Sequence, residues 1–290
     1  MRNFVNLNIK VRSNSSIFLK FLELNYGIFL NQNVQRYYKR NFSIDRDVTI
    51  DAIFGNENQN NFLTGFADIE RHIKCLLWDR FVILHASCVR YNGLNLFFMG
   101  SGESGKSTIC SAMYSYGGRV LSDDYSLVEI ATGRPHIFPT LIGSVRSGIK
   151  SEFQKKYLVP LKKYKNTYFA SSMLTMRKSE LNAFLLYHKK MYGISRSLTA
   201  GWIKKPQNIF IILKNSGRRQ KNNILLPKNS SYAIPELIKN IALNPKYCNG
   251  LVRKTLGVFL NSRYYVLHRA PLDLMTSAIY RTVKPSTRGI

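Results

Sequence analysis

The first 66 residues carry short apolar groups that are separated by asparagine and charged residues. The groups lie at residues 5–9, 17–19 and 26–30, and polar stretches such as Asn31-Gln32-Asn33 bound them. Alternation of this kind between polar turns is typical of short strands. Residues 55–61 are rich in asparagine and have the composition of a loop. The pattern therefore predicts a small N-terminal α+β region over residues 1–66, which ends near this loop.

A helix and a β-hairpin are predicted next along the chain. From Phe66 to Leu77 the apolar residues recur at a spacing that fits one helical face. An apolar run then predicts a strand from Phe81 to Tyr91, and Asn92-Gly93 is a strong signal for a two-residue hairpin turn. The strand Leu94–Met99 follows, so we expect it to have an antiparallel neighbour.

The pattern beyond Met99 predicts a second helix and a second short strand. The helix runs over Lys106–Tyr116, and Gly117-Gly118 ends it as a C-terminal cap. The strand Arg119–Leu121 then ends at Ser122-Asp123-Asp124. Two acidic residues therefore follow directly after a strand.

The signal weakens in the second half, where residues 150–178 are polar and basic and fit either helices or a loop. The later elements with clear signals are a hairpin with strands at residues 127–130 and 136–138 around Thr132-Gly133, a buried strand at Ile209–Leu213, a helix from Pro235 to Leu243 with proline at its start, and a strand at Tyr264–Leu267.

A glycine-rich motif, Gly-x-x-x-x-Gly-Lys-Ser, begins at Gly100 between the predicted strand and helix. Its glycines allow the backbone N–H groups to face a phosphate, and the positive end of the following helix attracts the same group. Lys106 is expected to reach the β- and γ-phosphates of ATP, and the Ser107 hydroxyl is expected to bind Mg²⁺. The residues predicted to bind the nucleotide are Gly100, Gly102, Glu103, Ser104, Gly105, Lys106, Ser107 and Thr108.

The letters of this motif also resemble those of heterotrimeric G-protein α subunits. That family needs an Asp-x-x-Gly switch and an Asn-Lys-x-Asp motif that reads guanine, and neither occurs in this sequence. Guanine specificity is therefore not predicted.

The residues around the motif resemble the catalytic domain of HPr kinase/phosphorylase and its shorter relatives. The resemblance rests on Leu84-His85-Ala86-Ser87, the Asn92-Gly93 turn, the glycine-rich motif and Leu121-Ser122-Asp123-Asp124. It is clear over residues 69–139 and fainter over 209–213 and 265–274. The shorter relatives include kinases encoded with peptide-tailoring enzymes and serine kinases for small molecules. Glu103 and Thr108 depart from the pattern of HPr kinase proper, so HPr is not the expected acceptor and no reverse phosphorylase activity is expected.

The resemblance implies an α/β fold of the P-loop, phosphoenolpyruvate-carboxykinase type, with a mixed sheet flanked by helices and a kinase domain over residues 67–290. It also implies ATP- and Mg²⁺-dependent transfer of the γ-phosphoryl group to a serine-type hydroxyl. In that interpretation Asp123 matches the family's base, and Asp124 holds Mg²⁺ together with Ser107. His85 would hydrogen-bond Asp123 or a γ-phosphate oxygen.

Bland alternatives exist for each of these residues. A serine hydroxyl is a weak acid, so a carboxylate such as Asp123 that accepts its proton would help the transfer. The alternative for the Asp123-Asp124 pair is a turn cap, and the alternative for His85 is a histidine buried in the core. For the function of the whole chain, one alternative to a kinase is a binding module that holds ATP without catalysis.

The net charge of +27 lies almost entirely in the second half, where residues 131–290 hold 29 Lys and Arg against 4 Asp and Glu. Such a charge attracts anions, including nucleic acid, acidic peptides and anionic membranes, although a lysine-rich proteome explains it equally well. Aromatic residues among the lysines, such as Tyr157 and Tyr164, make a nucleic-acid-binding ATPase the runner-up function. No helicase-like motif supports it, so the kinase ranks first. A basic half would suit an acidic peptide or a phosphorylated small molecule as acceptor.

Cysteine and histidine spacings give no metal or redox motif, so the cysteines Cys75, Cys88, Cys110 and Cys248 are expected to be buried thiols. No apolar run of 18 residues and no signal peptide are visible, which predicts a cytoplasmic protein without a transmembrane segment. Relatives of the predicted fold often assemble into oligomers, so the sequence leaves open whether this chain forms a homo-oligomer.

Overall fold

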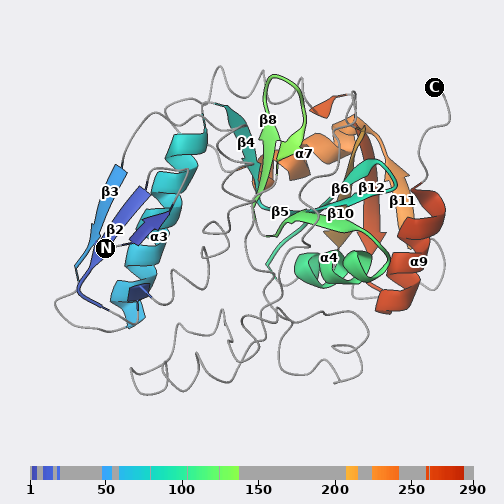
Figure 1. Ribbon diagram of the computed structural model, residues 1–290. Helices are drawn as coiled ribbons and strands as arrows, with labels where there is room; N and C mark the ends of the chain where they lie inside the picture. The colour runs from blue at the N-terminus through green and yellow to red at the C-terminus, as the bar shows by residue number, and fades with distance from the viewer. Residues whose placement is uncertain are drawn as a thin grey trace. The chain divides into compact units, whose positions relative to one another are not determined.

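The computed structural model describes residues 2–4, 9–15, 18–19, 48–53, 59–78, 80–102, 104–123, 125–136, 207–214, 224–241, 259–260 and 262–283. These residues form a mixed α/β structure of three sheets and several helices (Figure 1). The chain divides into two compact units. The first is Met1–Asp79 with Pro139–Ile149 and Val159–Leu198, and the second is Arg80–Phe138 with Lys150–Leu158 and Thr199–Ile290.

The first unit contains a three-stranded sheet and the helix α3 (Gln59–Leu77). The sheet has the order β1 (Arg2–Phe4), β2 (Ile9–Ser13) and β3 (Val48–Ala52), with β2 and β3 parallel. The helix predicted from Phe66 to Leu77 lies within α3 and is confirmed. The predicted strands match poorly, because β2 meets the apolar group 5–9 only at Ile9, residues 18–19 are helical, and residues 26–30 lie outside the described part. The loop predicted at residues 55–61 was placed too far along the chain at its C-terminal end, because α3 already includes Gln59 to Asn61. Asparagine costs only about 0.7 kcal/mol in a helix relative to alanine, so composition alone is weak evidence against one.

The second unit is built on a six-stranded mixed sheet with the order β11-β12-β10-β6-β5-β7. Its strands are β5 (Ala86–Tyr91), β6 (Leu94–Met99), β7 (Arg119–Ser122), β10 (Gln207–Lys214), β11 (Leu225–Lys228) and β12 (Arg263–His268). The central strands β6, β10 and β12 run parallel, whereas β5 is antiparallel to both of its neighbours. The strands predicted at residues 94–99, 119–121, 209–213 and 264–267 are confirmed.

The predicted hairpin is confirmed, but the strand predicted before it is two strands. Asn92 and Gly93 take φ values of 47° and 78°, which suit a tight two-residue turn between β5 and β6. The run Phe81–Tyr91 breaks at His85, whose N–H donates to the carbonyl of Asn240 at 2.7 Å. Before the break, β4 (Phe81–Leu84) joins a separate sheet with β8 (Ser126–Glu129) and β9 (Pro135–His136). A continuous apolar run cannot reveal a change of sheet, because both strands are buried.

The helix α4 (Lys106–Ser115) packs on one face of the six-stranded sheet, against β5, β6, β7 and the helix α9 (Leu272–Thr282) (Figure 1). Its predicted glycine cap is confirmed. Gly117 has a φ of 88°, and the N–H of Gly118 donates to the carbonyl of Met113 at 2.9 Å. This bond closes the last turn of a helix that ends in a left-handed residue.

The helix α7 (Ser230–Asn240) covers the opposite face, and its predicted start is wrong. The helix begins after Asn229, whose side chain accepts a hydrogen bond from the N–H of Tyr232 at 3.0 Å. Pro235 therefore lies inside the helix instead of at its first position. An asparagine cap was the better signal, because it satisfies an N–H that the helix itself leaves without a partner. The residues after Ile241 that were predicted to continue the helix lie outside the described part.

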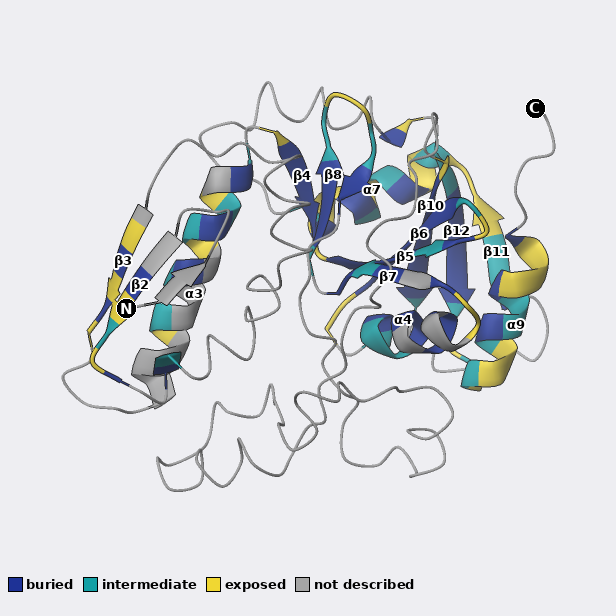
Figure 2. Ribbon diagram, viewed as in Figure 1, coloured by how far each residue is buried: buried dark blue, intermediate teal, exposed yellow. Residues whose placement is uncertain are grey.

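The main core fills the space between the sheet and α7. Phe97 stacks on Phe210 with ring centroids 4.7 Å apart, and Phe210 in turn lies 5.6 Å from Tyr264. Ala233 and Leu237 from α7 join this cluster, which is dark blue along the strands in Figure 2. The sheet is thus held rigidly at its centre, where the strand before the glycine-rich motif lies.

Cys88 and Cys110 are buried as predicted, whereas Cys75 is exposed on α3 and contradicts that prediction. Burial raises the pKa of Cys88 well above its ordinary value, so its thiol is a packing group. Cys248 lies outside the described residues. None of the described helices combines the length and the apolar character needed to cross a membrane.

Candidate functional site

A glycine-rich loop, residues 100–105, joins the end of β6 to the start of α4. The N–H of Ser104 donates to the carbonyl of Ser101 at 3.2 Å, and the N–H of Ile109 donates to the carbonyl of Gly105 at 3.0 Å. Strand, loop and helix follow in the order that the motif requires. The first N–H groups of α4 lie at the end of this loop and have no partner within the helix itself. Glu103 lies outside the described residues.

Two glycines of the loop are required for different reasons. A Cβ atom on Gly100 would lie 2.7 Å from Oγ of Ser104 and 3.0 Å from the carbonyl oxygen of Leu213 in β10. Gly105 has a φ of 98°, which L-residues rarely adopt. By contrast, no atom of the described residues lies within 4 Å of a Cβ placed on Gly102 or Gly105. The loop is therefore packed tightly at its start and open on its other side.

Lys106 lies over the start of the loop and is only 6% exposed. Its Nζ donates to the carbonyl oxygens of Gly100 at 2.9 Å and of Ser101 at 3.0 Å. The ammonium group is thereby held against the same backbone that would surround a phosphate. Ser107 and Thr108 are half-buried in the first turn of α4. Ser107 can offer a hydroxyl oxygen there.

Asp123 follows β7 and is fully buried. The hydroxyl of Ser87 in β5, which is also fully buried, donates a short hydrogen bond to Oδ1 of Asp123. The carbonyl of Asp123 accepts a hydrogen bond from the N–H of Tyr125 at 2.8 Å. Asp124, the predicted Mg²⁺ ligand, lies outside the described residues.

The strand register brings Asp123 and the glycine-rich loop to the same edge of the sheet. Ala86 in β5 pairs with Met99, the last residue of β6, and Cys88 in β5 pairs with Ser122, the last residue of β7. One strand therefore separates the two strand ends. Neighbouring strands lie about 4.8 Å apart, so these two strands are separated by roughly 10 Å across the sheet.

A bulge in β7 decides the face to which Asp123 points. Cys88 pairs with Ser122 and Val89 with Val120, so Leu121 is the extra residue. Leu121 packs on the core at the α7 face of the sheet, and the residue paired with Cys88 shares that face. Asp123 consequently points to the α4 face, where it meets Ser87. Bulges often redirect side chains in this way beside functional sites.

His85 lies at the same edge, directly before β5, and its side chain is exposed. This exposure contradicts the alternative of a core histidine. Its ring centroid lies 6.2 Å from that of Tyr125. The side chain that the structure brings to Oδ1 of Asp123 is Ser87, so the bond predicted between His85 and Asp123 stays a prediction.

Lys214 was missed by the sequence interpretation, although it ends the clearly predicted strand β10. Leu213 lies beside Gly100, so Lys214 reaches the edge next to the glycine-rich loop. Its Nζ lies 2.9 Å from Oε1 of Glu236 in α7. The hydrogen bond from Lys214 lowers the pKa of Glu236, and the positive charge of Lys214 adds to the effect.

Among the described residues, no three His, Cys, Asp or Glu side chains gather as a metal site.

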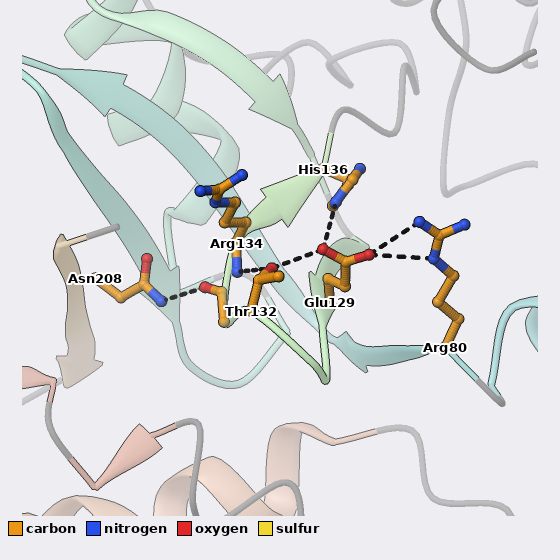
Figure 3. A network of polar contacts seen from close by, with 7 residues as sticks. Arg80, Glu129, Thr132, Arg134, His136 and Asn208 are labelled. Atoms are coloured by element: carbon orange, nitrogen blue, oxygen red, sulfur yellow. Dashed lines mark hydrogen bonds and ion pairs between the residues drawn. The ribbon is translucent and has the colours of Figure 1, made fainter. Parts of the chain in front are cut away.

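A second polar network lies at the opposite end of the strands (Figure 3). Glu129 accepts hydrogen bonds from Arg80 at 2.9 and 3.1 Å and from Thr132 at 2.6 Å. His136 lies 3.6 Å from the same carboxylate. Asn208, the second residue of β10, donates a hydrogen bond to the carbonyl of Gly133 at 2.8 Å. The network ties the β8–β9 turn to both sheets and has a structural role.

This network makes the fold sensitive to acid. Burial lowers the pKa of His136, and the neighbouring Glu129 offsets only part of that effect. Burial would raise the pKa of Glu129, but hydrogen bonds from Thr132 and Arg80 and the nearby positive charges lower it overall. The unfolded chain therefore binds more protons at both positions, so stability falls as the pH drops, first below about 6.5 for His136 and then below about 4.5 for Glu129.

We expect His136→Gln to flatten the first of these losses. The free energy of unfolding, measured by urea denaturation between pH 8 and 5.5, should fall less steeply in this variant than in the unchanged chain. Equal slopes for His136→Gln and the unchanged chain would contradict the assignment.

Comparison with known proteins does not identify the chain: no protein-family model matches it, and a search of curated proteins gave no match.

Proposed function

We propose that this chain is an ATP-dependent kinase that transfers the γ-phosphoryl group to a serine-type hydroxyl of a peptide, a protein or a small molecule. The proposal includes a P-loop fold of the phosphoenolpyruvate-carboxykinase type. One observation carries it. A glycine-rich loop with a buried lysine and a buried aspartate lie at the same edge of a mixed sheet, about two strand spacings apart. In this proposal the loop binds the donor phosphates and the aspartate faces the acceptor hydroxyl.

The loop suits the phosphates of ATP. Its open side next to Gly102 and Gly105 leaves room for phosphate oxygens, and the N-terminus of α4 favours their negative charge. Lys106 can exchange its bonds to Gly100 and Ser101 for bonds to the β- and γ-phosphates. The lysine would then stabilise charge that grows during transfer.

Mg²⁺ prefers oxygen ligands, and the Ser107 hydroxyl in the first turn of α4 provides one of the required type. Asp124 would provide a second, as the sequence predicts. When bound, the ion would neutralise charge on the β- and γ-phosphates.

Asp123 is proposed as the base. As the acceptor oxygen bonds to the γ-phosphorus, the bond from this phosphorus to the β,γ-bridging oxygen breaks and ADP leaves. The hydroxyl proton passes to the carboxylate of Asp123, which keeps the acceptor nucleophilic. His85, exposed at the same edge, stays the candidate for a contact with the γ-phosphate.

The direct test is phosphoryl transfer from ATP labelled at the γ-phosphate, with Mg²⁺ and a panel of hydroxyl acceptors. The panel should contain free serine and serine peptides of acidic, neutral and basic character. Label on an acceptor, strongest for the acidic ones, is expected. Tight ATP binding without label on any acceptor would instead favour a binding module.

Lys106→Met should lower the transfer rate by about 10²- to 10³-fold, the usual cost of one lost donor to the transition state. The change also removes two hydrogen bonds to the loop, so ATP affinity should fall as well. Lys239→Met is the control, because this lysine is exposed on α7 and its ion pair among the described residues is with Glu236. Near-equal rates for the two variants would argue against the assigned role of Lys106.

The strong positive charge supports a second candidate, a nucleic-acid-binding ATPase. It predicts ATP hydrolysis that oligonucleotides stimulate and binding that weakens steeply with salt. No binding to oligonucleotides at about 50 mM salt would exclude it.

A kinase that uses ATP fits the cytoplasmic location expected from the sequence. Sedimentation of the purified chain would test whether it forms a homo-oligomer.

A further inference from the structure

We propose that Ser87 is a positioning residue that orients Asp123 for proton transfer. The inference rests on the proposed kinase function. Its basis is the hydrogen bond from the Ser87 hydroxyl to Oδ1 of Asp123, between two side chains that are both fully buried. The two come from adjacent antiparallel strands and meet on the α4 face only because β7 bulges at Leu121.

A carboxylate needs such a partner if it is to act as a base. The last torsion of an aspartate side chain is broad and has no single preferred well. A base must lie within about 2.6–3.2 Å of the oxygen whose proton it takes. The hydrogen bond from Ser87 holds Oδ1 and thereby fixes the rotation of the whole carboxylate. Rotation of the carboxylate would break a buried hydrogen bond to a charged group, which is costly.

The step balances without any further reactant. The acceptor O–H bond breaks, its proton moves to the carboxylate of Asp123, and the oxygen forms the bond to phosphorus while ADP departs. Ser87 keeps its proton and its bond to Oδ1 throughout. Because Ser87 is fully buried, its proposed role is to act through Asp123 and not by direct contact with the acceptor or ATP.

Ser122 provides a matched control on the neighbouring strand. It is also a fully buried serine, and it lies directly beside Asp123 in sequence. Its hydroxyl shares a hydrogen bond of 2.7 Å with that of Ser126, whose hydroxyl donates to the carbonyl of Ala86. Ser122→Ala therefore removes the same group from the same region without touching the carboxylate. A purely structural role of Ser87 would make the two alanine variants behave alike.

The experiment compares kcat and the KM for ATP of Ser87→Ala and Ser122→Ala, with thermal unfolding measured alongside. Ser87→Ala should lower kcat by about 10- to 100-fold and leave the KM for ATP within about twofold, as expected for a lost orienting partner. Ser122→Ala should keep kcat within about threefold. Ser87→Thr, which retains the hydroxyl, should recover most of the rate.

Ser87→Cys keeps the volume of the side chain but loses the strong donor, so it serves if Ser87→Ala fails to fold, and the same drop in kcat is expected. Equal rates for Ser87→Ala or Ser87→Cys and Ser122→Ala would overturn the inference and leave the kinase proposal intact. Absence of transfer by the unchanged chain would overturn the kinase proposal, and this inference with it.

Discussion

Asp123→Asn should reduce phosphoryl transfer by about 10²- to 10⁴-fold, the usual contribution of a positioned base, while ATP binding changes little. The amide keeps the shape of the carboxylate and can still accept the hydrogen bond from Ser87 at its oxygen. It cannot take a proton from the acceptor hydroxyl. Rates of label transfer and calorimetric binding of ATP, measured on the same preparation, would separate chemistry from binding.

Asp273→Asn is the control for this variant. It makes the same chemical change at an exposed residue in the first turn of α9, on another element. Its transfer rate should match that of the unchanged chain. If Asp123→Asn kept most of the rate, Asp123 would instead be a structural carboxylate satisfied by Ser87, and the base would have to come from elsewhere.

The elements around the site could be predicted from local signals that act within a few residues. Asn92-Gly93 fixes a hairpin through its backbone conformation, and Gly117-Gly118 closes a helix through a bond to Met113. The run Ile209–Leu213 is too apolar to lie anywhere but in the sheet centre. Each of these signals depends on sequence neighbours, and each prediction is confirmed.

Features that depend on distant partners could not be predicted in the same way. The break at His85 is set by a bond to Asn240, which lies far along the chain. The hydrogen bond between Ser87 and Asp123 depends on the pairing of β5 with β7 and on a β-bulge in β7. No residue type in the sequence predicts this bulge. Ser87 was within the motif that the resemblance used, yet nothing local marked its hydroxyl as the partner of the carboxylate.

Gly100→Ala should disrupt the glycine-rich loop and lower ATP affinity by about 10- to 100-fold. The added Cβ would lie 3.0 Å from the carbonyl oxygen of Leu213, which belongs to the central strand β10 and pairs with Leu267 in β12, so its backbone cannot move without disturbing the sheet. The loop must therefore shift, at a cost of about 1–3 kcal/mol for overpacking. Thermal unfolding should occur at a lower temperature, and calorimetry should show the weaker binding of ATP.

Gly102→Ala separates the packing of the loop from its role in binding. A Cβ there meets no described atom within 4 Å, so the unfolding temperature should stay unchanged. ATP affinity should nevertheless fall, because the methyl group would enter the open side of the loop that we assign to the phosphates. Unchanged ATP affinity in Gly102→Ala would contradict the assignment of the phosphates to the open side of the loop. Unchanged stability in Gly100→Ala would show that the loop tolerates the contact with Leu213. Unchanged ATP affinity in that variant would show that the tight start of the loop has no part in holding the nucleotide.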